Sequence, residues 1–172
     1  IANGGYKIKP RVLYEDTQND LKSLIKLKNE KPDSLLSTDI FFKKFNLDPL
    51  FRNKENINFI KDAMYAATNE PGGTSYRSRF TKKEFIFAGK TGSSQVKRFT
   101  EKQREAEVKQ KDLDYKDRDH ALFVAFAPVS DPQYAISVLI EHGGSGSSAA
   151  APVAKKVIKK VLERHKERVL NQ

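Results

Sequence analysis

The stretch ALFVAFAPVSDPQYAISVLIE, residues 121–141, contains two apolar runs joined by a short polar connection. Residues 121–129 and 134–141 are rich in aromatic and β-branched side chains, which favour strands. Between them, residues 130–133 contain an Asp-Pro pair, which favours a turn. The sequence therefore predicts an antiparallel hairpin. Because neither run alternates cleanly between apolar and polar residues, it also predicts that both faces of the hairpin are largely covered.

Two helices and a further strand are predicted around this hairpin. Residues 56–69 carry apolar side chains at helical spacing, and the Pro71-Gly72-Gly73 sequence ends that helix. Residues 83–96 are predicted as a strand, in which glycines mark places where another backbone comes close. A Gly- and Ser-rich segment, 143–148, precedes an amphipathic C-terminal helix that we place against the sheet. The apolar stripe predicted for this helix consists of Val153, Ala154, Val157, Ile158, Val161 and Leu162.

The remaining segments are less regular. Residues 1–5 are typical of the last turn of a helix closed by glycine, which suggests that the chain is part of a longer protein. Residues 6–14 alternate as a half-exposed edge strand would, and residues 15–55 are predicted as loop with one or two helical turns. Residues 97–118 carry both charge signs and few aliphatic side chains, too few to offset the entropy of ordering, so we expect a mobile loop.

Composition narrows the class of protein. The 172 residues are 38% hydrophobic, enough for one domain with a hydrophobic core. The chain has no cysteine, which excludes disulfides and thiolate metal sites. No apolar run is long enough to cross a bilayer, and no signal peptide is recognisable near Ile1. With 32 Lys and Arg against 22 Asp and Glu, the net charge is +10, which favours polyanions and makes nucleic acid a hypothesis to test.

Two longer motifs carry a resemblance to a known family. These are FAGKTGSSQV at residues 87–96 and RDHALFVAFAP at residues 118–128, and further matches lie at residues 1–5, 69–74 and 141–152 in the same order. Together they resemble class B penicillin-binding proteins of the penicillin-binding protein 2 type. The resemblance implies an α+β fold: an antiparallel sheet with the C-terminal helix packed on it, forming part of the β-lactamase-like transpeptidase fold. Residues 1–172 would be the C-terminal portion of that domain.

The resemblance also assigns roles along the Lys-Thr-Gly strand. Lys90 would attract the terminal carboxylate of a D-alanyl-D-alanine stem peptide or of a β-lactam, and Thr91 would hydrogen-bond it. Gly92 would leave room for close approach, and the peptide would lie along the strand as an added strand. Ser93 would offer its backbone N–H as half of an oxyanion hole.

The nucleophile that the family requires is not found in its expected setting. The family uses a Ser-x-x-Lys serine that forms an acyl-enzyme and passes it to an amine. Ser23 and Ser94 each begin such a tetrapeptide, but the first lies in a polar segment and the second directly follows Lys-Thr-Gly, contrary to the family order. No Ser-x-Asn triplet occurs. We therefore expect this chain to be inactive alone, with the catalytic serine elsewhere in a parent D,D-transpeptidase.

The resemblance implies a cellular setting as well. The parent enzyme would act at the periplasmic face of the bacterial inner membrane during cell-wall elongation, with an anchor outside this chain. Its partners would be stem peptides, β-lactams and a glycan polymerase of the elongation machinery. Without the helical half of the domain, one face of the sheet would be uncovered, so we expect an apolar patch that promotes self-association.

Three features of the sequence also allow an alternative interpretation as a metal, dinucleotide or nucleic-acid site. The histidines His120, His142 and His165 lack the spacing of metal ligands, so we assign no metal. Residues 144–149 mimic a dinucleotide fingerprint, but no second strand follows the helix, so we expect no cofactor and a flexible entry to a capped helix instead. Residues 123–126 echo an RNA-recognition strand, which makes a basic nucleic-acid-binding module the alternative function. The preceding residues lack the glycine and the stacking aromatic of that motif, so we expect no nucleic acid partner.

Overall fold

The computed structural model describes residues 1–7, 50, 52–98, 101 and 109–170, and the chain divides into two compact units, 1–60 and 61–172. In the first unit, the Gly4 N–H donates to the Ile1 carbonyl over 3.0 Å. Gly4 and Gly5 have φ angles of 82° and 89°, a left-handed conformation that favours glycine and agrees with the predicted glycine-closed turn. Apart from Tyr6 and Lys7, the strand predicted at 6–14 lies outside the described residues, as does most of the loop predicted at 15–55.

Helix α3, Lys54–Asn69, confirms the helix predicted at 56–69. It begins where the Asn53 side chain accepts the Glu55 N–H over 2.8 Å, as a helix-capping residue does. The predicted apolar face is covered only in part, because Ile57 is 8% exposed whereas Ile60 is 38% exposed. Apolar periodicity identifies a side that can be buried, but it does not supply the surface that covers it.

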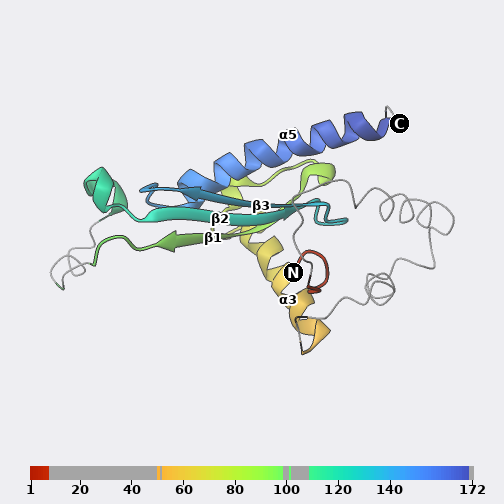
Figure 1. Cartoon of the computed structure of the whole chain (residues 1–172), viewed down its shortest axis with the longest axis horizontal. Helices are drawn as coiled ribbons and strands as arrows, with labels where there is room; N and C mark the ends of the chain where they lie inside the picture. Colours follow the sequence, from red (N-terminus) through yellow and green to blue (C-terminus); the bar gives the residue numbers. More distant parts are fainter. Residues whose placement is uncertain (8–49, 51, 99–100, 102–108, 171–172) are drawn as a thin grey trace. The chain divides into compact units, whose positions relative to one another are not determined.

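A three-stranded antiparallel sheet forms the centre of the second unit (Figure 1). Its strands are β1, Ala88–Ser94, β2, His120–Ala127, and β3, Tyr134–Ile140, in the order β1-β2-β3. The hairpin of β2 and β3 therefore confirms the prediction for residues 121–141. The prediction for β1 was too long at its start, because residues 83–85 form a 3-10 turn. Pairing starts at Ala88 opposite Phe126, since β2 ends at Ala127 and the following proline has no N–H to donate.

Helix α5, Ala151–Leu170, covers one face of this sheet (Figure 1). Its buried residues share a core with alternate residues of β2 and with aromatic side chains that precede β1. The helix prediction is confirmed, but the stripe is narrower than expected: Val153 and Val157 are 41% and 43% exposed. The side chains that complete this core are Phe85, Phe87, Ala121, Phe123, Ala125, Ala127, Ala150, Ala151, Ala154, Ile158 and Leu162.

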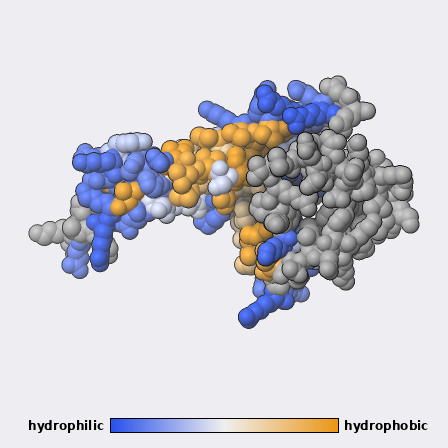
Figure 2. Space-filling model, in the orientation of Figure 1, coloured by the Kyte–Doolittle hydropathy of each residue, from blue (hydrophilic) through white to orange (hydrophobic). Residues whose placement is uncertain are grey.

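The opposite face of the sheet is not covered by any described residue to the same extent. Along β3, exposed and half-buried residues alternate, and Leu139 is 57% exposed. On β2, Val124 is 45% exposed. The prediction that both faces of the hairpin are covered is therefore wrong for the described part of the chain. Figure 2 shows apolar side chains gathered over the strands, below the hydrophilic outer face of α5.

The connection from β1 to β2 is described in part. Residues 110–112 and 115–117 each form a 3-10 turn. Most of the remaining loop, residues 99–100 and 102–108, lies outside the described residues, so the expected mobility of residues 97–118 stays a prediction.

Candidate functional site

The four residues Lys90 to Ser93 lie in the middle of β1, an edge strand. Within the described part of the chain, β1 pairs with β2 along one edge and with no strand along the other. Lys90 and Ser93 are exposed, and Thr91 and Gly92 are half-buried. Edge strands present unpaired backbone N–H and C=O groups. The motif therefore lies on a β-edge that is open to another chain.

The end of α3 shows which backbone groups of β1 point outward. Thr68 Oγ1 accepts a hydrogen bond from the Gly89 N–H over 3.1 Å and lies 3.4 Å from the Gly89 carbonyl oxygen, to which it can donate. In an antiparallel ladder the two polar groups of one residue point to the same side, and the side alternates from residue to residue. The N–H and C=O groups of Thr91 and Ser93 therefore also point away from β2. The open edge offers the Ser93 N–H as a donor.

The side chains of β1 alternate between the two faces of the sheet. Thr91 lies opposite the buried Phe123, on the face that α5 covers, whereas Lys90 lies opposite Val124 on the other face. Lys90 Nζ donates to the Thr91 carbonyl over 2.7 Å, and Lys90 has no carboxylate partner among the residues that the structure describes. Thr91 Oγ1 donates to Thr74 Oγ1 over 3.2 Å. The Lys90 ammonium thus has no counter-charge from the described residues on the uncovered face, which suits the binding of a carboxylate, whereas the Thr91 and Thr74 hydroxyl groups pair on the opposite face.

Gly146 allows the turn before α5 to pack closely against the backbone of β1 and β2. Gly146 begins a π-helical turn, 146–150, that leads into α5. A Cβ atom at Gly146 would lie 2.4 Å from the Leu122 carbonyl oxygen and 2.7 Å from the Gly92 carbonyl oxygen. A Cβ atom at Gly92 would meet only the Leu122 Cβ, at 3.4 Å. Packing inside the protein therefore requires glycine at 146 but not at 92, where the absence of a side chain leaves the strand accessible.

Asp119 joins the far end of β1 to the connection that follows it. Its Oδ1 accepts the Val96 N–H over 3.3 Å, and its Oδ2 accepts the Gln110 side-chain amide over 2.9 Å. The Asp119 N–H donates to the Gln110 side-chain carbonyl over 2.8 Å, and the Asp119 carbonyl accepts the Gly144 N–H over 2.8 Å. One residue thus connects the end of β1, the β1–β2 connection and the glycine-rich turn.

The three histidines have structural contacts. The His142 N–H donates to His120 Nδ1 over 2.9 Å, and their rings lie 4.7 Å apart. His142 has a φ of 52°, and His165 Nδ1 lies 2.8 Å from the Tyr134 hydroxyl. Within the described ranges, no three His, Asp or Glu side chains are placed to hold a metal ion.

Comparison with known proteins supplies the family. The family model described as "Penicillin binding protein transpeptidase domain" matches residues 1–159. The chain belongs to the penicillin-binding protein transpeptidase family. Among curated relatives, "Peptidoglycan D,D-transpeptidase MrdA" of Salmonella typhimurium is 36% identical over 99 residues, 58% of this chain and 15% of that protein. The protein of the same name from Haemophilus influenzae is 40% identical over 100 residues, 57% of this chain and 14% of that protein.

Solved structures agree with this membership. The "Complex between Penicillin-Binding Protein (PBP2) and MreC from Helicobacter pylori" aligns with 68% of this chain and 19% of that chain, at a TM-score of 0.55 and 32% identity. A transpeptidase domain from Eggerthella lenta, at 20% identity and a TM-score of 0.50, shows the same fold. The expected penicillin-binding protein 2 type and the partial transpeptidase fold are thus confirmed. The chain spans about 15% of the length of the MrdA proteins.

The structure also bears on the RNA-like strand, the two Ser-x-x-Lys serines and the glycine-rich segment. Phe123 and Phe126, the aromatic residues of the RNA-like strand, are 0% and 3% exposed, so neither can stack on a base. Ser94 is the last residue of β1 and does not begin a helix, so it lacks the setting of the family's nucleophile. Ser23 lies outside the described residues. Residues 144–149, predicted as a flexible entry to a capped helix, contain the buried Gly146, and no side-chain hydrogen bond caps the π-helical turn at Ser145.

Sequence reasoning missed several residues that position this transpeptidase-family strand. Thr68 and Asp119 form their contacts through single side chains, and a lone Thr or Asp carries no periodic signal in the sequence. Gly146 was noticed only as part of a glycine-rich run. The segment 69–74, by contrast, was part of the resemblance, and it contains Thr74, the hydrogen-bond partner of Thr91.

Proposed function

We propose that this chain is the substrate-strand portion of a peptidoglycan D,D-transpeptidase that cross-links stem peptides through a serine acyl-enzyme. The observation that carries the proposal is the open edge of β1, where Lys90 has no acidic partner among the described residues and alternate amides point outward. Family membership supplies the reaction type.

In this proposal, β1 binds the D-alanyl-D-alanine end of a stem peptide or a β-lactam. Lys90 attracts the terminal carboxylate and Thr91 hydrogen-bonds it. The outward Ser93 N–H supplies one donor of the oxyanion hole, an element whose loss typically slows such reactions by ~100- to 1000-fold. The peptide adds its backbone to the open edge, and Gly92 leaves space for it.

The nucleophile belongs to a part of the parent enzyme that this chain does not include. The chain alone therefore binds substrate without cleaving it, and the acyl-enzyme forms on a serine supplied from elsewhere. Lys90, Thr91 and Ser93 then act on substrate held at β1, orienting the carboxylate and stabilising the developing oxyanion.

The test measures covalent and reversible binding separately in the 172-residue chain. Intact-mass spectrometry after incubation with a fluorescent penicillin should show no adduct. NMR titration with a peptide that ends in D-alanyl-D-alanine should shift the amides of β1, and Lys90→Ala should weaken this binding by about tenfold, the loss of one charge-assisted contact. Lys160→Ala is the matched control for loss of charge. A penicillin adduct that survives Lys90→Ala but disappears in Ser23→Ala would overturn the proposal that the nucleophilic serine is supplied from outside this chain.

The parent is proposed to act at the periplasmic face of the inner membrane, with a glycan polymerase of cell-wall elongation as partner. Support comes from the MrdA relatives and from the Helicobacter pylori penicillin-binding protein, whose solved complex contains MreC. Among the described residues, no helix has the length and apolar character to cross a membrane. Co-purification of the parent enzyme with a tagged polymerase, and its loss when the anchor is removed, would test this setting.

A further inference from the structure

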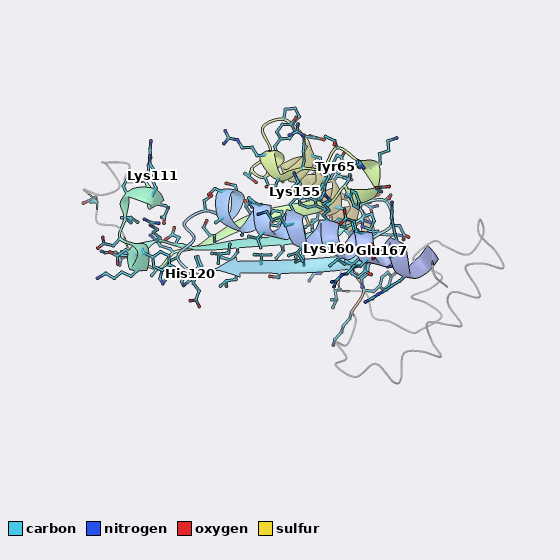
Figure 3. All side chains as sticks on the ribbon, turned by 90° about the horizontal axis from the view of Figure 1, so that it is seen from above. Tyr65, Lys111, His120, Lys155, Lys160 and Glu167 are labelled. Atoms are coloured by element: carbon cyan, nitrogen blue, oxygen red, sulfur yellow. The ribbon has the colours of Figure 1, made fainter. Side chains whose placement is uncertain are left out.

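A groove of about 860 Å³ lies between residues 72–80 and the first turns of α5. One wall comes from the chain that leaves α3, and the other comes from α5 and the turn before it. Figure 3, which looks down on α5, shows Lys155 on the flank of the helix that faces this segment. The groove belongs entirely to the second unit, and Lys90 to Ser93 are not among the residues that line it.

Four cationic side chains line the groove, and no acidic side chain does. Arg77 stands on one wall, and Lys155, Lys156 and Lys159 stand on the other. Lys159 pairs with Glu163 at 3.7 Å, whereas the other three have no carboxylate partner in the described part of the chain. Like charges that gather without counter-charges destabilise a fold, so this cluster suits the binding of an anion.

The floor of the groove is apolar and its walls are fixed. Phe80 lies beneath Lys155, with the Lys155 Nζ 5.2 Å from the ring centroid. The neighbouring chain is held by the Ser75 hydroxyl, which is buried, donates to the Ala67 carbonyl over 3.1 Å and contacts Thr68 Oγ1 at 3.2 Å. A Cβ atom at Gly73 would lie 2.5 Å from the Ala67 carbonyl oxygen, so the turn sits directly on the end of α3. The site is therefore formed before any ligand binds.

The groove adjoins β1 through two of its lining residues. Thr74 lines the groove and receives the hydrogen bond from Thr91, on the face of the sheet that α5 covers. Ser147 lines the groove one residue after Gly146, which contacts the Gly92 backbone. The groove therefore lies next to the Thr91 side of β1, whereas Lys90 projects from the opposite face of the strand.

We propose that this groove binds the carboxylate-bearing part of a peptide substrate, beyond the terminal carboxylate that β1 receives. The inference rests on the proposed function for the identity of the peptide, but the basic groove itself does not depend on it. Arg77 and Lys156 pair with internal carboxylates from opposite walls, and the apolar floor contacts the intervening side chains. An acidic peptide fits better than inorganic phosphate, because the groove has a volume of about 860 Å³, is partly apolar and adjoins a strand that is proposed to bind an extended chain.

Two matched peptides test the proposal in the 172-residue chain by isothermal titration calorimetry. Both end in D-alanyl-D-alanine; one carries two internal carboxylates and the other has both amidated. The acidic peptide should bind about tenfold more tightly, the ratio expected from two exposed ion pairs. The double variant R77Q/K156Q should reduce that ratio to below about twofold while leaving the amidated peptide unchanged. The control K160Q/R164Q removes the same charge from α5 outside the groove and should keep the ratio.

The outcomes separate the two proposals. Lys90→Ala should weaken both peptides equally, and if it has no effect while the groove variants do, the function proposed for β1 fails and the groove stands. Equal affinity of the two peptides, or a ratio that survives R77Q/K156Q, overturns the groove. Failure of both peptides to bind overturns both proposals. Inorganic phosphate or poly-glutamate that displaces the acidic peptide at lower concentration than the peptide itself would assign the groove to a phosphate ligand or a protein partner instead.

Discussion

Replacement of Gly146 by alanine tests whether the tight contact of the turn before α5 holds β1 in place. The new Cβ would lie 2.4 Å from the Leu122 carbonyl oxygen, 2.7 Å from the Gly92 carbonyl oxygen and 3.1 Å from the Gly92 nitrogen. All three atoms belong to the backbone of paired strands, so none can move without disturbing the sheet. Overpacking of a well-packed site typically costs ~1–3 kcal/mol. We expect a loss of stability at the upper end of that range, because relief requires β1 and β2 to shift together.

The matched control is Gly92→Ala. Its Cβ would meet a single side-chain atom, the Leu122 Cβ, at 3.4 Å, which is ordinary contact. An alanine at a compatible position restricts the unfolded chain and typically adds ~0.4–1 kcal/mol. The two variants add the same methyl group, yet we expect opposite signs.

Urea unfolding followed by circular dichroism measures both free energies of unfolding. The melting temperature should fall by several degrees for Gly146→Ala, at ~2–4 °C per kcal/mol for a chain of this size. Binding of a D-alanyl-D-alanine peptide supplies the second readout: Gly92→Ala should weaken it despite its unchanged or raised stability. If Gly146→Ala is as stable as the unaltered chain, the close packing of the π-helical turn on β1 is refuted.

Three further predictions follow from contacts in the second unit. Thr68→Val should lower the free energy of unfolding by about 1–3 kcal/mol, because it leaves the Gly89 N–H without its partner. Thr81→Val, at an exposed position, should change the free energy of unfolding little. Equal effects of the two substitutions would contradict the role of Thr68 in holding β1. The hydrogen bond from Lys166 lowers the pKa of Glu84, so this pair stabilises the folded state above the ordinary glutamate pKa and is lost as the pH falls through the lowered value; Lys166→Gln should raise the Glu84 pKa in an NMR titration, and an unchanged pKa would refute the pairing. Leu139 is 57% exposed on the uncovered side of the sheet, so sedimentation should show self-association of the chain that Leu139→Lys reduces, and a monomer at high concentration would contradict this.

The hairpin and the C-terminal helix could be predicted because their signals are local. Residues 121–141 carry strand-forming side chains around a turn, and the helix repeats apolar residues at a helical period. The start of β1 could not be predicted in the same way. Phe85 and Phe87 alternate as in a strand, but they enter the core from a 3-10 turn and a short link, where no strand among the described residues pairs with them.

Which side chains of the sheet and of α5 are buried depends on contacts between residues that are distant in sequence. Val157 has the side chain of a core residue, yet it is 43% exposed because α5 turns Ala154 and Ile158 toward the sheet. The motif residues of the candidate site were found through resemblance, whereas its supports, Thr68 and Asp119, appear only once the chain is folded. Single hydrogen-bonding side chains leave no pattern from which their partners can be inferred.

The alternation of backbone groups along β1 has a consequence for the function proposed for this strand. The donor at position 93 belongs to the main chain, so exchanging the serine side chain for another small residue leaves that donor in place. Under the function proposed for β1, a variant that evades a β-lactam at this position would have to tilt or bulge the whole strand, and the same displacement would disturb binding of the proposed peptide substrate.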